Sequence, residues 1–158
     1  VAWLHYWKEI FTNEGRGTLH NANFPGLSII RSPVWSKLPP GSPMTEIMQL
    51  DAGFGALTAV FELLVQNRSG EIVVLPSLHN TWRQASFDGV ATEGAFRLGA
   101  TVNRNRVEEV RVKSLKGGRL RLRHGLGGKW LLNGAEARGD LLERECRAGE
   151  KLVLTRKP

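Results

Sequence analysis

Residues 49–70 read Gln-Leu-Asp-Ala-Gly-Phe-Gly-Ala-Leu-Thr-Ala-Val-Phe-Glu-Leu-Leu-Val-Gln-Asn-Arg-Ser-Gly, and this stretch divides the chain into two unlike parts. Its apolar residues recur every three or four positions, which is typical of a helix with one buried face. The pattern predicts a helix over 54–67 that stops before Gly70. Asp51 stands just ahead of it, where a carboxylate can cap free backbone N–H groups and interact favourably with the helix dipole.

After residue 70 the helical spacing gives way to short runs with a period of two. The run 119–124 has a strict period of two, with Leu120 and Leu122 on one side and Arg119, Arg121 and Arg123 on the other, and the Gly117-Gly118 pair before it has the form of a hairpin turn. Many short strands at roughly ten-residue spacing indicate an antiparallel β-sandwich. The predicted strands are 71–75, 86–90, 95–100, 106–115, 119–124, 129–132 and 151–155.

Ahead of this boundary, residues 1–13 have the loose spacing of a helix, and a long segment rich in Pro and Gly follows as far as about residue 43. The sequence therefore predicts two pieces: helices with a long loop over 1–68 and a β module over 70–158. Because the chain opens with Val1 inside a helical pattern, we expect it to be a fragment of a longer polypeptide. A helix and loop separated from their neighbours should expose apolar surface, which predicts aggregation or dependence on a partner.

The net charge of +7 is concentrated in one half of the chain: residues 1–96 carry −2, and residues 97–158 carry +9. A basic half can attract nucleic acid or anionic polymers, or it can be an ordinary solvated β surface. The arginines of 119–124 do face one way, but aromatic residues for base stacking are lacking there, which makes nucleic acid an unlikely partner. The single cysteine, Cys146, excludes an internal disulfide and is expected to be a small buried apolar residue.

Several short motifs occur in order over residues 44–100 and carry a resemblance to a known family. They are Gln49-Leu50-Asp51-Ala52-Gly53-Phe54-Gly55, Val65-Gln66-Asn67, Gly70-Glu71-Ile72, Leu75-Pro76-Ser77-Leu78, Trp82 and Gly94-Ala95-Phe96. This arrangement resembles the junction between the helical catalytic barrel and the C-terminal β domain of glycoside hydrolase family 95, the inverting α-L-fucosidases. The resemblance implies an α+β fragment: the tail of an (α/α) helical barrel followed by a C-terminal antiparallel β-sandwich domain.

The resemblance also implies site residues. Inverting glycosidases place an acid and a water-activating group on opposite sides of the glycosidic bond. In the family an Asp polarises the Asn that contacts the water, and Asp51 matches that Asp. The general acid and the catalytic Asn match no position in this chain. Apart from the resemblance, Gln49 and His20 are polar residues that are either candidate substrate-binding residues or ordinary solvated loop residues.

Three positions depart from the family pattern: Gly53 replaces the usual Asn, His79 the second Pro, and Glu93 a common Arg. A relative that acts on another sugar therefore fits as well as a fucosidase. His79 and Trp82 follow the Leu-Pro run, and Trp82 is expected to anchor the β module against the helix or, as an alternative, to stack on a sugar.

The expected partners are a glycan substrate and the N-terminal part of the same polypeptide, without which the piece should be inactive because acid and base act together. The alternative is a non-catalytic carbohydrate-binding or basic interaction module. No spacing of His, Cys and acidic residues predicts a metal, and no cofactor is expected. No apolar run is long enough to cross a membrane, and the compartment stays open.

Overall fold

The computed structural model describes residues 50–157, with side chains described from Gly53 onward. One helix, α2 (Leu50–Leu64), is followed by ten strands and one short 3₁₀ turn, η2 (Glu93–Ala95). The strands are β1 (Val65–Arg68), β2 (Glu71–Val74), β3 (Gln84–Thr92), β4 (Phe96–Asn103), β5 (Arg106–Ser114), β6 (Gly118–Arg123), β7 (Lys129–Leu132), β8 (Ala135–Arg138), β9 (Leu141–Cys146) and β10 (Lys151–Arg156). The chain divides after Ala59 into two units, and the unit Val60–Pro158 contains all ten of these strands.

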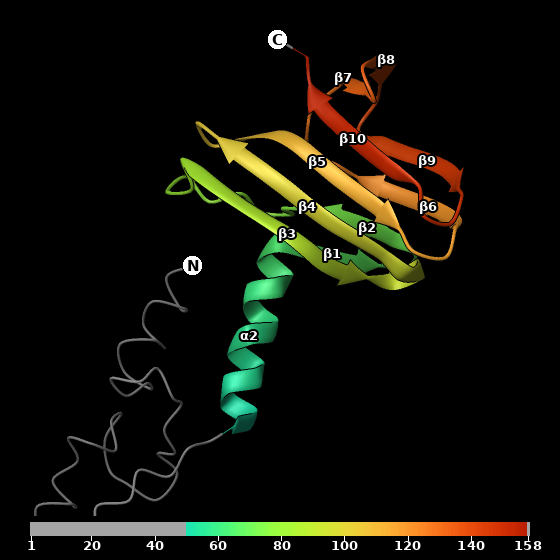
Figure 1. Cartoon of the computed structure of the whole chain (residues 1–158). Helices are drawn as coiled ribbons and strands as arrows, with labels where there is room; N and C mark the ends of the chain where they lie inside the picture. The colour runs from blue at the N-terminus through green and yellow to red at the C-terminus, as the bar shows by residue number, and fades with distance from the viewer. Residues whose placement is uncertain (1–49, 158) are drawn as a thin grey trace, which may run out of the picture. The chain divides into compact units, whose positions relative to one another are not determined.

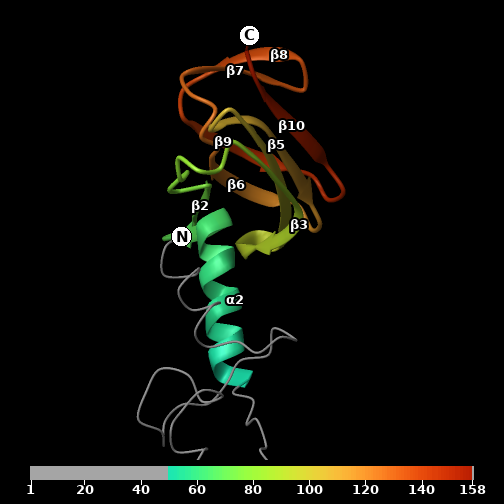
Figure 2. The ribbon, with the colours of Figure 1, turned by 90° about the vertical axis from the view of Figure 1, so that its left-hand side faces the viewer.

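The strands form two sheets, as a sandwich requires. One sheet has four strands in the order β1-β2-β6-β9, and the other has six in the order β3-β4-β5-β10-β7-β8. In Figure 1, β3, β4, β5 and β10 run side by side, and Figure 2 shows β2, β6 and β9 to their left as a second layer. The predicted antiparallel pairing is confirmed except between β2 and β6, which are parallel. The predicted tail of a helical barrel stays a prediction: α2 is the one α-helix of the described residues, and residues 1–49 lie outside them.

The prediction of a helix over 54–67 is wrong at both ends, because α2 spans Leu50–Leu64. Val65 is buried at 6% exposure and pairs with Val74, so the chain changes directly from helix to strand. Ser69 and Gly70 both have positive φ, at 50° and 79°, and form the two-residue turn of the β1–β2 hairpin. The polar residues that resembled a helix stop are therefore hairpin residues.

The predicted hairpin at Gly117-Gly118 is also wrong, because β5 and β6 lie in different sheets. Both glycines have positive φ, at 82° and 109°, and the Gly117 amide donates a hydrogen bond of 3.0 Å to Ser114 Oγ. A Cβ at Gly117 would lie 3.0 Å from the Cys146 carbonyl oxygen. The glycines thus allow a close crossing from one layer to the other, which a period-two pattern cannot distinguish from a hairpin.

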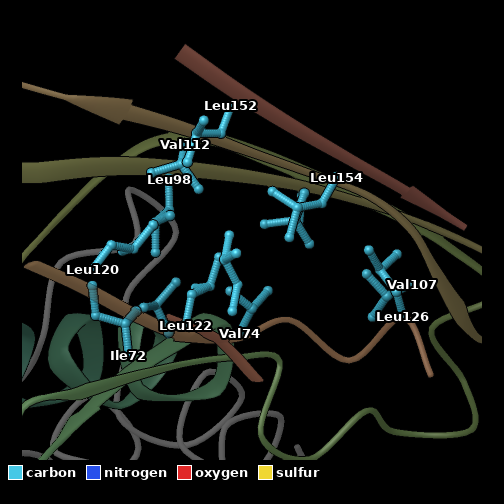
Figure 3. Close-up of a cluster of buried hydrophobic side chains, with 14 of the residues drawn as sticks. Ile72, Val74, Leu98, Val107, Val112, Leu120, Leu122, Leu126, Leu152 and Leu154 are labelled. Carbon is cyan, nitrogen blue, oxygen red and sulfur yellow. The ribbon is translucent and has the colours of Figure 1, made fainter. Parts of the chain in front are cut away.

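The core lies between the inner faces of the two sheets. Figure 3 shows Leu98, Val112 and Leu152 of the six-stranded sheet pointing toward Ile72, Leu120 and Leu122 of the four-stranded sheet. Each of these six side chains is at most 4% exposed. Cys146 is buried in the same cluster as expected, and burial raises the pKa of its thiol.

Candidate functional site

The predicted catalytic residue, Asp51, lies within α2 rather than ahead of it. The helix also includes Gly53 and Gly55 of the motif around Asp51. Of the two predicted substrate-binding residues, both His20 and Gln49 lie outside the described residues. The described structure therefore places the backbone of Asp51 in a helix, and a site formed by Asp51 with Gln49 and His20 stays a prediction.

Helix α2 carries an exposed apolar face. Phe54, Leu57 and Phe61 follow the i, i+3, i+7 spacing and are 65%, 51% and 44% exposed. The buried face that this spacing predicted is thus open in this chain, in agreement with the expectation of exposed apolar surface. The C-terminal end of the helix is fixed to the β-sandwich: Leu64 packs against the core, and its carbonyl accepts a hydrogen bond of 2.8 Å from the Leu75 amide.

The loop between β2 and β3 carries His79 and Trp82. His79 Nδ1 lies 2.8 Å from Thr81 Oγ1, and the His79 carbonyl accepts a 3.0 Å hydrogen bond from the Trp82 amide. The Arg83 amide donates to the Thr81 carbonyl at 2.9 Å. Trp82 is half-buried and packs against the sandwich core, so its main described role is to hold this loop down.

A polar hollow of about 720 Å³ lies where this loop meets the tip of the β4–β5 hairpin. It is lined by residues of polar type, two arginines and four residues with carboxamide side chains: Asn80, Arg83, Gln84, Asn103, Arg104 and Asn105. Two parts of the chain form it, because Gln84 at the start of β3 pairs with Asn103 at the end of β4. Sequence reasoning did not find this site, although a two-residue turn without glycine at Arg104-Asn105 was a visible signal.

The arginine row of β6 (Arg119, Arg121 and Arg123) is not a free cationic surface. Arg121 Nε donates to Glu143 at 2.6 Å, and Arg123 Nε donates to Glu71 at 2.7 Å. Each arginine thus has a carboxylate on a neighbouring strand, and Glu71 raises the pKa of Arg123. The row is therefore a set of cross-strand ion pairs, which reduces its value as an anion-binding stripe.

His124 is the most buried titratable group of the sandwich, at 0% exposure. Its Nδ1 accepts a 3.2 Å hydrogen bond from the Leu126 amide, and its ring lies 4.5 Å from that of Trp130. Burial lowers the pKa of His124, which favours the neutral ring. These contacts give His124 a packing role in the sandwich core.

Two classes of site find no support among the described residues. Over residues 50–157, no group of three or more His, Cys, Asp or Glu side chains could hold a metal ion. Within the same part of the chain, the one α-helix lacks the length and apolar character needed to span a bilayer. The candidates for a functional site that remain are thus the polar hollow and Asp51 in α2.

Comparison with known proteins assigns the β unit. Residues 66–147 match the family model described as glycoside hydrolase family 95, C-terminal domain. No curated protein matches the chain. The matched segment runs from β1 to the end of β9 and so includes the strands of both sheets except β10. Because the match covers more than half of the 158 residues, the chain belongs to glycoside hydrolase family 95 and carries its C-terminal domain.

Proposed function

We propose that this chain is the C-terminal portion of an inverting glycoside hydrolase with α-L-fucosidase-like chemistry, in which Asp51 is one active-site carboxylate. The observation that carries the proposal is the family match over 66–147, immediately after the helix that contains Asp51. In an inverting reaction one group protonates the leaving oxygen while another activates a water on the opposite face of the sugar. The Asp51 carboxylate acts on the water side, by polarising a neighbouring amide that orients the water.

The β-sandwich has a bracing role in this proposal. Helix α2 passes into β1 without a linker, and Leu64 is held by the core and by the Leu75 amide. A rigid helix end restricts the positions available to a catalytic group in that helix, and misplacement by about 1 Å can cost a hundredfold in rate. The exposed face at Phe54, Leu57 and Phe61 is the kind of surface that other helices of a barrel would cover.

The proposal requires the remaining catalytic groups to come from an N-terminal part of the same polypeptide. The 158-residue chain should therefore have no measurable glycosidase activity, because one carboxylate cannot supply both the acid and the base functions. The substrate is a glycan with a terminal α-linked deoxy sugar or a close relative of it.

The test compares three forms of the longer polypeptide: the parent, Asp51→Asn and Glu62→Gln. Glu62 is an exposed acid on the same helix and serves as the matched control. Activity is measured on an aryl α-L-fucoside and on related aryl glycosides, and NMR identifies the first anomer released. We expect Asp51→Asn to lose at least about a hundredfold in kcat/KM, Glu62→Gln to keep activity, and the product to appear with inverted configuration.

Equal activity of the parent and Asp51→Asn would contradict the catalytic role of Asp51. Retained configuration would contradict the inverting mechanism. A folded parent with no activity on any glycoside would contradict the enzymatic proposal while leaving the family membership intact.

A further inference from the structure

The polar hollow between the β2–β3 loop and the β4–β5 turn lies outside everything that the proposed function uses. Its lining combines Arg83 and Arg104 with the carboxamides of Asn80, Gln84, Asn103 and Asn105. A second hollow of about 400 Å³ adjoins the same turn and is lined by Asn103, Arg104, Arg106 and Glu108. Arg104 and Asn103 therefore belong to both hollows, which together could hold more than one sugar ring.

The turn that forms this site departs from the turns that the chain uses elsewhere. The described hairpins β1–β2, β4–β5 and β7–β8 each have a two-residue turn with positive φ at both positions. Two of these turns end in glycine, at Ser69-Gly70 and Asn133-Gly134, whereas the third is Arg104-Asn105, with φ of 48° and 60°. Positive φ is unfavourable for a residue with a Cβ, least so for Asn, and Arg is a costly choice there. Strain of this kind tends to accumulate at functional sites.

Neither arginine of the hollow has a carboxylate partner among the described residues. Among the ion pairs that described residues form, none includes Arg83 or Arg104. Arg97, Arg106, Arg138 and Arg147 likewise form none among these residues, whereas Arg111, Arg121 and Arg123 each pair with a carboxylate. The hollow is therefore lined by two arginines whose guanidinium groups have no described carboxylate partner and can donate to an anion.

Asn105 adds a hydrogen-bonding requirement. Its Oδ1 is shielded from solvent and accepts no hydrogen bond from the described residues. A rotation of the carboxamide that presents this oxygen to a ligand hydroxyl would lose no described hydrogen bond. A bare inorganic anion would leave this acceptor unpaired, whereas a sugar offers hydroxyl donors beside its charged group.

We propose that this hollow binds an acidic sugar residue of a glycan. Arg83 and Arg104 donate to its carboxylate, and the surrounding carboxamides bind its hydroxyls. Guanidinium groups bind carboxylates with two parallel hydrogen bonds, and amide side chains suit hydroxyl groups that both donate and accept. Among the described residues that line it, none has an aromatic ring on which a nucleic-acid base could stack. That the ligand is a glycan rests on the proposed function, and the acidic group rests on the hollow itself.

The experiment measures binding to the 158-residue chain by calorimetry, so it requires no catalytic activity. The probes are trigalacturonate and its carboxyl-reduced neutral counterpart. The variants are Arg83→Gln and Arg104→Gln, and Arg119→Gln is the control, because Arg119 lies on the outer face of the other sheet. We expect the parent chain to bind trigalacturonate and not the neutral trisaccharide. Each hollow variant should weaken trigalacturonate binding by at least about tenfold. Arg119→Gln should bind trigalacturonate as tightly as the parent does.

A second variant separates binding from folding. The double substitution Arg104→Asn with Asn105→Gly installs the turn sequence found at residues 133–134. It should raise the midpoint of thermal unfolding by a few degrees, because it removes strain, and it should abolish trigalacturonate binding. A stabilised variant that still binds would overturn the proposal.

Other outcomes would also overturn it. Equal affinity for the neutral trisaccharide would show that the carboxylate is not recognised. An equal loss of trigalacturonate affinity in Arg119→Gln would indicate general charge attraction. Tighter binding of a short oligothymidylate than of trigalacturonate would assign the hollow to nucleic acid. Absence of trigalacturonate binding would reject the site, whatever the Asp51→Asn experiment shows. Conversely, if Asp51→Asn keeps full activity but trigalacturonate still binds, the proposed function is wrong and the binding site stands.

Discussion

Helix α2 and the facing sheets of the sandwich both carry apolar side chains at regular spacing, but only the sheets bury them. Leu98, Leu120 and Leu122 are 0% exposed, whereas Phe54 and Leu57 on the helix are 65% and 51% exposed. The difference arises because each sheet supplies the cover for the other, and a helical face needs a further element to cover it. Periodicity in a sequence therefore identifies an apolar face without showing what lies against it.

The largest expected effect is on the buried side of this comparison, at Trp130. Its side chain is 2% exposed, its Nε1 donates to the Gly139 carbonyl at 2.8 Å, and its ring contacts His124. We expect Trp130→Ala to lower the free energy of unfolding by about 3–5 kcal/mol, because it leaves a large cavity and an unpaired carbonyl. Urea denaturation followed by circular dichroism measures this change. Trp82→Ala is the control, since Trp82 is only half-buried and should cost clearly less; equal losses would show that burial in the sandwich does not determine the cost.

A smaller loss of stability is expected from a substitution at Gly99, over which the side chains of Asp88 and Arg111 meet. A bulge in β3 places Asp88 and Gly89 opposite Gly99, and Arg111 reaches over Gly99 to Asp88 and to the Phe87 carbonyl. A Cβ at position 99 would lie 3.0 Å from the Phe87 carbonyl oxygen and would collide with the Asp88 carboxylate. We expect Gly99→Ala to destabilise the chain by about 1–3 kcal/mol, because the backbone of β3 must shift.

The matched control for this prediction is Gly128→Ala. A Cβ at Gly128 would contact no described atom within 4 Å, and its φ is not in the left-handed region. Thermal unfolding of both variants distinguishes crowding from the general effect of removing a glycine. A Gly99→Ala protein as stable as the parent would mean that the bulge adapts without cost.

The buried histidine predicts a dependence on pH. Burial lowers the pKa of His124 from its ordinary value of 6.5, and Asp140 and Arg123 act on it in opposite directions. Below pH 6.5 the unfolded chain takes up a proton at His124 that the folded chain resists. The contribution of this group to the free energy of unfolding is therefore present above pH 6.5 and is lost as the pH falls toward the folded-state pKa. The loss from one group is at most about 1.4 kcal/mol for each pH unit.

Denaturation of the parent and of His124→Gln between about pH 7.5 and pH 5.5 measures this effect. The variant has no titrating group at the position, so its free energy of unfolding should fall less over the same interval. Parallel curves for the two proteins would show that His124 does not titrate on unfolding in this range.

Strand prediction succeeded where local alternation and the final structure agreed, as in β2, β5, β6 and β10. It missed β9, whose sequence Leu-Leu-Glu-Arg-Glu-Cys favours a helix by intrinsic propensity. Pairing with β6, including the Arg121–Glu143 hydrogen bond of 2.6 Å, overrides that preference. It also missed β8, an exposed edge strand with the sequence Ala-Glu-Ala-Arg, in which no β-branched residue indicates a strand.

The functional features also divide into those that local sequence predicts and those that depend on the pairing of distant segments. The family could be identified from ordered motifs over 44–100, which are local in the sequence, and the match over 66–147 confirms it. The polar hollow could not be identified from the sequence, because Arg83 and Arg104 come together only when β3 pairs with β4. The catalytic role of Asp51 stays a prediction, since its carboxylate can be tested only together with the groups that complete the site.

The smallest expected change in stability lies on the exposed side of the comparison. Phe54→Ser should alter the free energy of unfolding by no more than about 0.5 kcal/mol, because a side chain that is 65% exposed loses little when it is removed. The same substitution should lower the binding of an apolar fluorescent dye and the light scattering of concentrated solutions, because it interrupts the stripe formed with Leu57 and Phe61. Leu115→Ser is the control: Leu115 is 43% exposed but lies on the β unit, outside that stripe. If Phe54→Ser destabilised the chain as strongly as a core substitution, the helix face would be covered in solution and the contrast with the sheets would disappear. If instead only the scattering falls, the face is open and available to the helices that a barrel would supply.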